Sequence, residues 1–295
     1  MDRDWIIIVL LGMAFGSTLF FNEIMLRDMG PFFAALSRVG PAALVSWVFL
    51  IVSGRDWQAG IPQLGALAML GVLFFWMPMT AFPVGQQYIE SGLAGIINAM
   101  TPVFTVLISH VWPGGERATP LKFLGVLTGF CGIFLLTLPS LGSGEDTRLF
   151  GILITLLAPL GFAIGLNWVR RITDLDPIVM ITWAFTCAAA FMLITAFFFE
   201  DAPTMVRPST WAAIAFSGVI LTGLLFQIAF IMLPRAGATK TSTLTFIAPI
   251  TALILGSWLL NERLQLAHVV GMAVIFLGLF LIDERLFMKR ARKDG

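Results

Sequence analysis

The amino-acid sequence predicts an all-α membrane protein in which ten transmembrane helices form two inverted five-helix repeats. Three observations lead to this fold class. Only 12% of the 295 residues are charged and 58% are hydrophobic, whereas soluble domains carry about 25% charged residues. The apolar residues gather in runs of about 20, the length of helix that crosses a hydrocarbon core about 30 Å thick. A Glu-Arg corner followed by glycine also occurs twice, at Glu116 and at Glu262.

Ten apolar runs, each bounded by charged residues, Pro or Gly, account for most of the chain. The first follows Met-Asp-Arg-Asp and lacks an Ala-x-Ala cleavage site, so we interpret it as a retained helix and not as a secretion signal. The connections are short, and no domain is expected outside the bilayer. In chain order the expected spans cover residues 5–22, 32–52, 64–85, 92–111, 120–138, 149–169, 177–199, 211–233, 241–260 and 266–282.

The two halves of the chain resemble each other. A shift of 147 residues places Pro102 on Pro249, and after one inserted residue a shift of 146 places Glu116 on Glu262. Each half contains five spans, and an odd number means that the second half enters the membrane from the opposite side. The expected organisation is a first repeat at 1–139, an inverted second repeat at 149–284 and a basic tail at 285–295.

The distribution of basic residues predicts the orientation. Thirteen of the 18 Lys and Arg residues fall on one side of the ten spans, four fall on the other, and Arg38 lies within a span. Because cytoplasmic loops carry the excess of Lys and Arg, we expect both termini and the tail in the cytoplasm.

An inverted repeat is typical of alternating-access transporters, whose binding site lies near the bilayer midplane between the halves. A polar group in hydrocarbon tends to face the bundle interior, so polar stripes indicate the route. The candidate pathway residues are Trp76, Thr80, Gln87, Asn98, Thr101, Thr105, Asn167, Trp168, Trp183, Gln227, Phe230 and Thr245. For each threonine, packing or a bond to its own helix is an equal alternative.

Three further features of the spans allow two interpretations each. Arg38 either snorkels to the outer surface or contacts a substrate carboxylate. Pro102 and Pro249 either act in gating or are tolerated without moving. The Gly12-x-x-x-Gly16 spacing marks close helix packing more often than a site.

The sequence argues against an intramembrane enzyme, the competing functional class. It contains no HExxH motif, no paired acids within a span and no Ser positioned to use either histidine, so no catalytic, metal or cofactor site is expected. The predicted spans contain no Asp or Glu, and no P-loop is present. We therefore expect a facilitator or exchanger.

The stretch SGLAGIINAMTPVFTVLISHVWPGGER and its later counterpart TLTFIAPITALILGSWLLNER resemble the drug/metabolite transporter superfamily, and within it the EamA-type ten-helix branch. The resemblance covers nearly the whole chain and extends to bacterial aromatic amino-acid exporters. It implies export of amino acids or related metabolites across the bacterial inner membrane, with drug efflux as the alternative. The expected partners are a small-molecule substrate and membrane lipids without nucleic acid, and the chain is expected as a monomer or homodimer.

Overall fold

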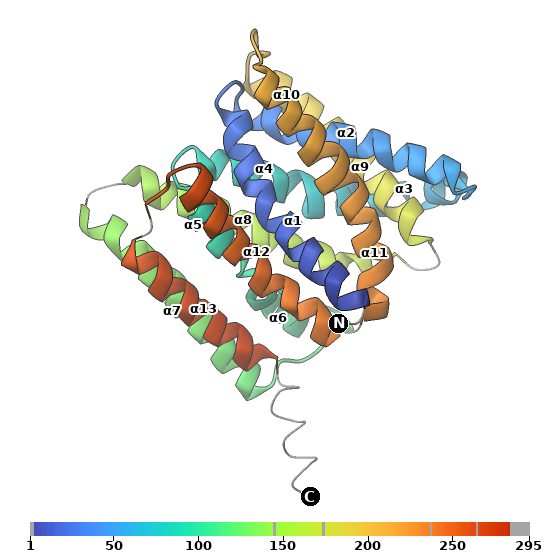
Figure 1. Ribbon diagram of the computed structural model, residues 1–295. Coiled ribbons are helices and arrows are strands. Elements are labelled where there is room, and N and C mark those ends of the chain that lie inside the picture. Colours follow the sequence, from blue (N-terminus) through green and yellow to red (C-terminus); the bar gives the residue numbers. More distant parts are fainter. Residues whose placement is uncertain (1–2, 144–145, 173–174, 237, 264, 284–295) are drawn as a thin grey trace, which may run out of the picture.

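The computed structural model describes residues 3–143, 146–172, 175–236, 238–263 and 265–283, and all regular structure in these ranges is helical (Figure 1). Eight of the described segments are long and apolar enough to cross a membrane, and two shorter apolar helices complete the expected ten. The all-helical fold class is therefore confirmed, whereas the predicted basic tail lies outside the described residues.

The helical segments follow the predicted spans closely. The first half comprises α1 (Arg3–Leu26), α2 (Pro31–Val52), η1 (Trp57–Gln63), α3 (Leu64–Leu70), η2 (Gly71–Trp76), α4 (Met77–Gln86), α5 (Ser91–Asn98), α6 (Thr101–Val111) and α7 (Pro120–Ser143). The second half comprises α8 (Asp146–Val169), α9 (Pro177–Phe199), α10 (Pro208–Ile214), η3 (Ala215–Leu224), α11 (Leu225–Ala236), α12 (Ala238–Leu259) and α13 (Leu266–Ile282). Because α1 continues to Leu26, Glu23 lies inside a span, and the expectation of acid-free spans was wrong at this position.

The two halves interlock by equivalent contacts. The first helix of each half packs on the fourth segment of the other: α1 lies along α12, and α8 lies along α5 and α6. The second helix of each half packs on the third segment of the other half: α2 contacts η3, and α9 contacts η2. The two fifth helices, α7 and α13, form a pair at one edge of the bundle (Figure 1). Exchanging the halves therefore reproduces these contacts, although α8 also packs closely on α4 whereas α1 makes little contact with the equivalent α11.

Small residues allow the close contact between α1 and α12. A Cβ added at Gly12 would lie 2.7 Å from Ile247 Cβ, and one added at Gly16 would collide with the backbone oxygen of Ala248. Such distances are well inside van der Waals contact, so only glycine fits. The packing interpretation of the Gly12-x-x-x-Gly16 spacing is confirmed.

The third segment of each half contains a π-helical stretch, which the sequence analysis did not predict. These stretches are η2 and η3, and the repeat shift of 147 carries η2 onto the centre of η3. Each contains a glycine that faces a neighbouring helix: Gly71 approaches the backbone of α9, and Gly218 approaches the backbone of α2 at Arg38. π-Helical turns are rare and occur frequently at functional sites.

The fourth segment of the first half is broken near its middle. The helix stops at Asn98 and restarts at Thr101. Pro102 explains the break, because it has no N–H to donate to Asn98 and its ring clashes with that carbonyl in a continuous helix. The Thr101 hydroxyl donates to the Asn98 carbonyl oxygen instead, at 2.8 Å. In the second half, α12 continues through the equivalent Pro249.

Candidate functional site

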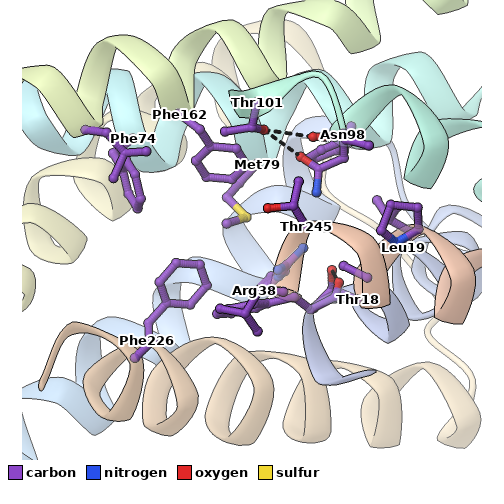
Figure 2. A pocket seen from close by; sticks show the side chains of 18 of the residues that line it. Thr18, Leu19, Arg38, Phe74, Met79, Asn98, Thr101, Phe162, Phe226 and Thr245 are labelled. Atoms are coloured by element: carbon purple, nitrogen blue, oxygen red, sulfur yellow. Dashed lines mark hydrogen bonds between the residues drawn. The ribbon is translucent and has the colours of Figure 1, made fainter. Parts of the chain in front are cut away.

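A cavity of about 290 Å³ lies where the halves meet, at the level of the break between α5 and α6 (Figure 2). It lies at the seam between two apolar cores: Leu19 and Phe82 belong to one core, and Phe74 and Met79 belong to the other. Seven helical spans contribute side chains to its wall. A volume near 300 Å³ is the lower limit of ordinary ligand pockets, which suits a small metabolite.

The wall of the cavity is mainly aromatic. Its six phenylalanines are Phe15, Phe74, Phe82, Phe162, Phe226 and Phe230. Its polar side chains are Thr18, Arg38, Asn98, Thr101 and Thr245. In Figure 2, Phe74, Phe162 and Phe226 lie to one side and Thr18, Asn98 and Thr245 to the other, with Arg38 between the two groups. The cavity can therefore take a molecule with an apolar body and a polar head.

Arg38 does not snorkel to the surface, and that interpretation was wrong. Only 4% of the residue is exposed. Its Nε donates to the buried Thr222 hydroxyl of η3 at 2.8 Å, which holds the side chain against the second half. Among the described residues no carboxylate forms an ion pair with Arg38.

Several of the predicted site residues line this cavity, and they come from the pathway set, the carboxylate contact and the gating pair. They are Arg38, Asn98, Thr101, Phe230, Thr245 and Pro249. Asn98 stands at the end of α5, where its Nδ2 has no hydrogen-bond partner among the described residues. The break in the fourth segment thus presents the amide of Asn98 and the Thr101 side chain to the cavity.

The three predicted tryptophans lie elsewhere and have other partners for their indole N–H groups. Trp76 donates to Thr195 at 3.2 Å. Trp168 donates to the carbonyl of Ala66 at 2.9 Å, and Trp183 donates to the carbonyl of Trp57 at 3.0 Å. These bonds tie helices together outside the cavity wall.

The remaining predicted residues also lie outside the cavity wall. Asn167 accepts from Ser109 at 2.7 Å, and Gln227 contacts Thr182 at 3.5 Å. Thr105 bonds to the carbonyl of Thr101 in its own helix. Thr80 is buried, Pro102 is partly buried beside the break, and Gln87 is exposed at one end of the bundle.

That end, which we call the Asp28 end, carries the loops at residues 27–30, 87–90, 200–207 and 260–263. Three carboxylates there cap helices of the other half. Glu262 accepts from the backbone N–H groups of Ser91 and Gly92 at 2.8 and 2.9 Å. Glu200 accepts from Phe32 and Phe33, each at 3.0 Å. A carboxylate satisfies the free amides of a helix N-terminus and complements the helix dipole.

Asp28 forms the third of these caps. It accepts from the backbone N–H of Arg207 at 2.9 Å and from the Arg207 guanidinium. The hydrogen bond from the Arg207 side chain is the main reason that the pKa of Asp28 is well below its usual range, and the Thr210 hydroxyl adds to this effect. The opposite end has an equivalent pair between Arg55 and Asp176.

Comparison with known proteins identifies the family. The model of the EamA-like transporter family matches residues 4–138 and again residues 149–282. The chain belongs to the EamA-like transporter family. The double match falls on the two halves that interlock in the structure, and an EamA-like protein is a membrane transporter and not an enzyme.

Relatives of this EamA-like chain are distant but extend over most of its length. The uncharacterized transporter YoaV of Bacillus subtilis is 23% identical, with 93% of this chain and 94% of YoaV covered. The uncharacterized inner membrane transporter YedA of Escherichia coli K12 is 26% identical, with 90% and 86% covered. A chloroplastic WAT1-related protein of Arabidopsis thaliana is 26% identical, with 95% and 69% covered.

A solved crystal structure shares the fold. It superimposes with a TM-score of 0.66 over 94% of this chain and 96% of the other, at 18% sequence identity. An identity this low carries the architecture alone.

Five of the six phenylalanines and Thr18 were not predicted to line the cavity of this EamA-like transporter. A phenylalanine that faces a cavity and one that faces lipid look alike in an apolar run, so the sequence holds no signal for them. Thr18 offered a signal as a polar residue in the first span. The buried pair in which Asn22 Nδ2 donates to Gln86 Oε1 at 3.0 Å was also missed, although both residues lie at span ends.

Proposed function

We propose that this transporter exports amino acids or related small metabolites across the bacterial inner membrane by alternating access. The observation that supports this proposal most strongly is the cavity at the interface of the two halves. Its wall includes side chains from both sides of the break between α5 and α6. Discontinuous helices at a repeat interface are the usual construction of carrier binding sites. Both termini face the cytoplasm in this proposal, so the Asp28 end faces outward, and the chain works as a monomer or homodimer.

The carrier works as a facilitator or exchanger. Among the described residues no Asp or Glu lines the cavity, so a carboxylate proton relay at the substrate is absent there. Glu23 lies near the Asp28 end, in a separate polar hollow with Arg27 and Glu262. Proton movement in fixed ratio to substrate in sealed vesicles contradicts this part of the proposal.

Counterflow in proteoliposomes tests the function. Vesicles preloaded with unlabelled amino acids receive labelled phenylalanine, threonine or a quaternary-ammonium drug in separate experiments. We expect uptake of a labelled amino acid that depends on the preloaded pool. Exchange of the drug alone would instead assign the carrier to drug efflux, and no exchange with any amino acid contradicts the proposal.

Thr101 and Thr105 provide a matched pair of variants for this experiment. Both hydroxyls donate to backbone carbonyls of the fourth segment, Thr101 across the break to Asn98 and Thr105 to Thr101, but only Thr101 lines the cavity. Thr101→Val is expected to lower counterflow at least about tenfold, the effect of a lost polar contact in a water-poor site. Thr105→Val is expected to stay within about twofold of wild type. Equal effects of the two substitutions contradict the assignment of the cavity as the transport site.

A further inference from the structure

Arg38 is held in place as a fixed cation facing the cavity. Its residue is 4% exposed, and Nε is bound to Thr222, itself fully buried in the π-helical η3. Gly218, one turn earlier in η3, lets α2 approach so closely that an added Cβ would lie 3.1 Å from the Arg38 carbonyl oxygen. The two halves therefore share the positioning of this guanidinium.

The positive charge of Arg38 is not balanced by a carboxylate of the described residues. The other arginines in described ion pairs, Arg55, Arg148 and Arg207, meet carboxylates near the ends of the bundle. The Nη1 and Nη2 groups of Arg38 have no such partner among the described residues, and the residue borders the cavity. A buried charge without a partner costs several kcal/mol, whereas a charge-assisted bond to a ligand carboxylate removes the imbalance.

The rest of the cavity favours an organic anion. The phenylalanine wall offers apolar surface to a hydrocarbon or aromatic body. No described acid faces the cavity to hold a cationic drug. The Asn98 amide and the Thr101 side chain at the broken helix provide polar contacts for a further polar group of the substrate.

We propose that the central cavity is a site for small organic carboxylates, with the Nη groups of Arg38 binding the carboxylate and the phenylalanine wall binding an apolar or aromatic body. The site deepens the export function proposed above and rests on it. Amino acids can bind at this site through their carboxylate. Amphiphiles that carry only a positive charge are excluded.

Ligand-induced shifts in the melting temperature of the purified wild-type protein test the proposal first. The probes are phenylalanine, 3-phenylpropionate, which lacks the ammonium group, and phenethylamine, which lacks the carboxylate. A ligand that binds only the folded protein raises its melting temperature. We expect both carboxylates to raise it and phenethylamine to leave it unchanged. Equal protection by phenethylamine, or none by either carboxylate, overturns the proposal.

Variants of Arg38 locate the effect. Arg38→Leu is expected to weaken binding of 3-phenylpropionate about 10- to 100-fold, as for the loss of a hydrogen bond to a charged group. Arg38→Lys retains the charge without the forked donors and is expected to recover part of this loss. Arg171→Leu is the control, because Arg171 is exposed at the end of the bundle opposite the Asp28 end, and this variant is expected to leave binding unchanged. Full 3-phenylpropionate binding by Arg38→Leu contradicts the assignment.

The two proposals fail in different ways. Wild-type counterflow of the quaternary-ammonium drug without carboxylate binding would preserve the carrier and overturn the carboxylate site. Carboxylate binding that requires Arg38, without counterflow of any carboxylate, would preserve the site and contradict the export function.

Discussion

Some buried polar side chains of this protein have all their hydrogen-bonding groups paired and others do not. This difference predicts how much stability is lost when each side chain is replaced. Asn167 accepts from Ser109 and donates to the Ala163 carbonyl at 3.0 Å, whereas among the described residues Gln227 has one long contact and its buried Oε1 has no partner. We expect Asn167→Leu to destabilise the protein by about 1–2 kcal/mol and Gln227→Leu by less than about 0.5 kcal/mol. Thermal unfolding in detergent measures both.

The same two variants separate structural from transport roles. Since neither residue lines the cavity, the KM for substrate is expected to stay within about twofold of wild type in both variants, after correction for the amount of folded protein. A large rise in KM for Gln227→Leu without a loss of stability would place the transport route along Gln227 instead.

Asp28 gives the protein a stability that depends on pH in a defined direction. Its pKa is lower in the folded protein than in the unfolded chain, so the contribution is complete above the unfolded value of about 4 and is lost as the pH falls toward the folded value. We expect wild type to melt above Asp28→Asn at pH 7, and the difference to narrow only below pH about 4. A difference that is constant from pH 7 to pH 3 would show that the charge of Asp28 is unimportant.

At the residue scale the sequence predicted which helix faces are polar but not what each side chain contacts. Asn98, Thr101 and Thr105 follow one stripe at helical spacing, yet only the first two reach the cavity. Periodicity assigns a face, whereas the partner depends on the neighbouring helix and on the break at residue 99. Arg38 shows the same limit, because its burial depends on Thr222, 184 residues away in the sequence.

The broken fourth segment is the element most directly tied to the proposed transport cycle. Pro102→Ala restores a backbone N–H and removes the clash with residue 98, so it favours a continuous helix across the break. We expect this variant to fold with unchanged or higher stability but to lose at least about tenfold in transport rate, because Asn98 and Thr101 leave their places in the cavity wall.

Pro249→Ala is the matched control for the role of this element. Pro249 lies within the continuous α12, so replacing it changes the backbone path less, and we expect a smaller loss of transport. Wild-type transport by both variants would assign both prolines to the tolerated class and remove their gating role.

Element boundaries were predicted well because charged residues, Pro and Gly mark the ends of apolar runs. The second, seventh and tenth segments match the expected ranges within about one residue. The internal changes at η2, at η3 and between α5 and α6 were not predicted, because apolar composition is the same in α- and π-helical turns. Pro102 and Pro249 are equivalent in sequence, yet α12 continues through Pro249, so a proline within a span does not by itself predict a break.

At the scale of the whole molecule, the duplication places two equivalent carboxylates, Glu116 and Glu262, at opposite ends of the bundle. The repeated Glu-Arg corner places Glu262 on the N-terminus of α5 at the Asp28 end, whereas its counterpart Glu116 contacts Lys122 at 2.5 Å. The duplication and inverted architecture were readable from the sequence, because the corner, its prolines and the number of spans are all encoded locally. The cap itself was not, since it joins residues 171 positions apart.

Glu262 is expected to hold the cavity closed toward the Asp28 end. Glu262→Gln keeps the shape but loses the charge that strengthens the two bonds to the α5 amides. Opening of this end then becomes easier, and access to the cavity from that side rises. The labelling experiment described below checks this prediction. Glu200→Gln is the control, because Glu200 lies at the same end of the bundle but caps α2, away from the break after α5.

The most direct test of alternating access is thiol labelling of one cavity position from each side of the membrane. Thr101→Cys, in a chain whose Cys131 and Cys187 are replaced by Ala, is exposed to a membrane-impermeant maleimide in right-side-out and in inside-out vesicles. We predict labelling from both sides, a change in the ratio of the two rates when substrate is added, and faster labelling from the Asp28 end in the Glu262→Gln background. Labelling from one side alone, unaffected by substrate and by Glu262→Gln, would contradict the account.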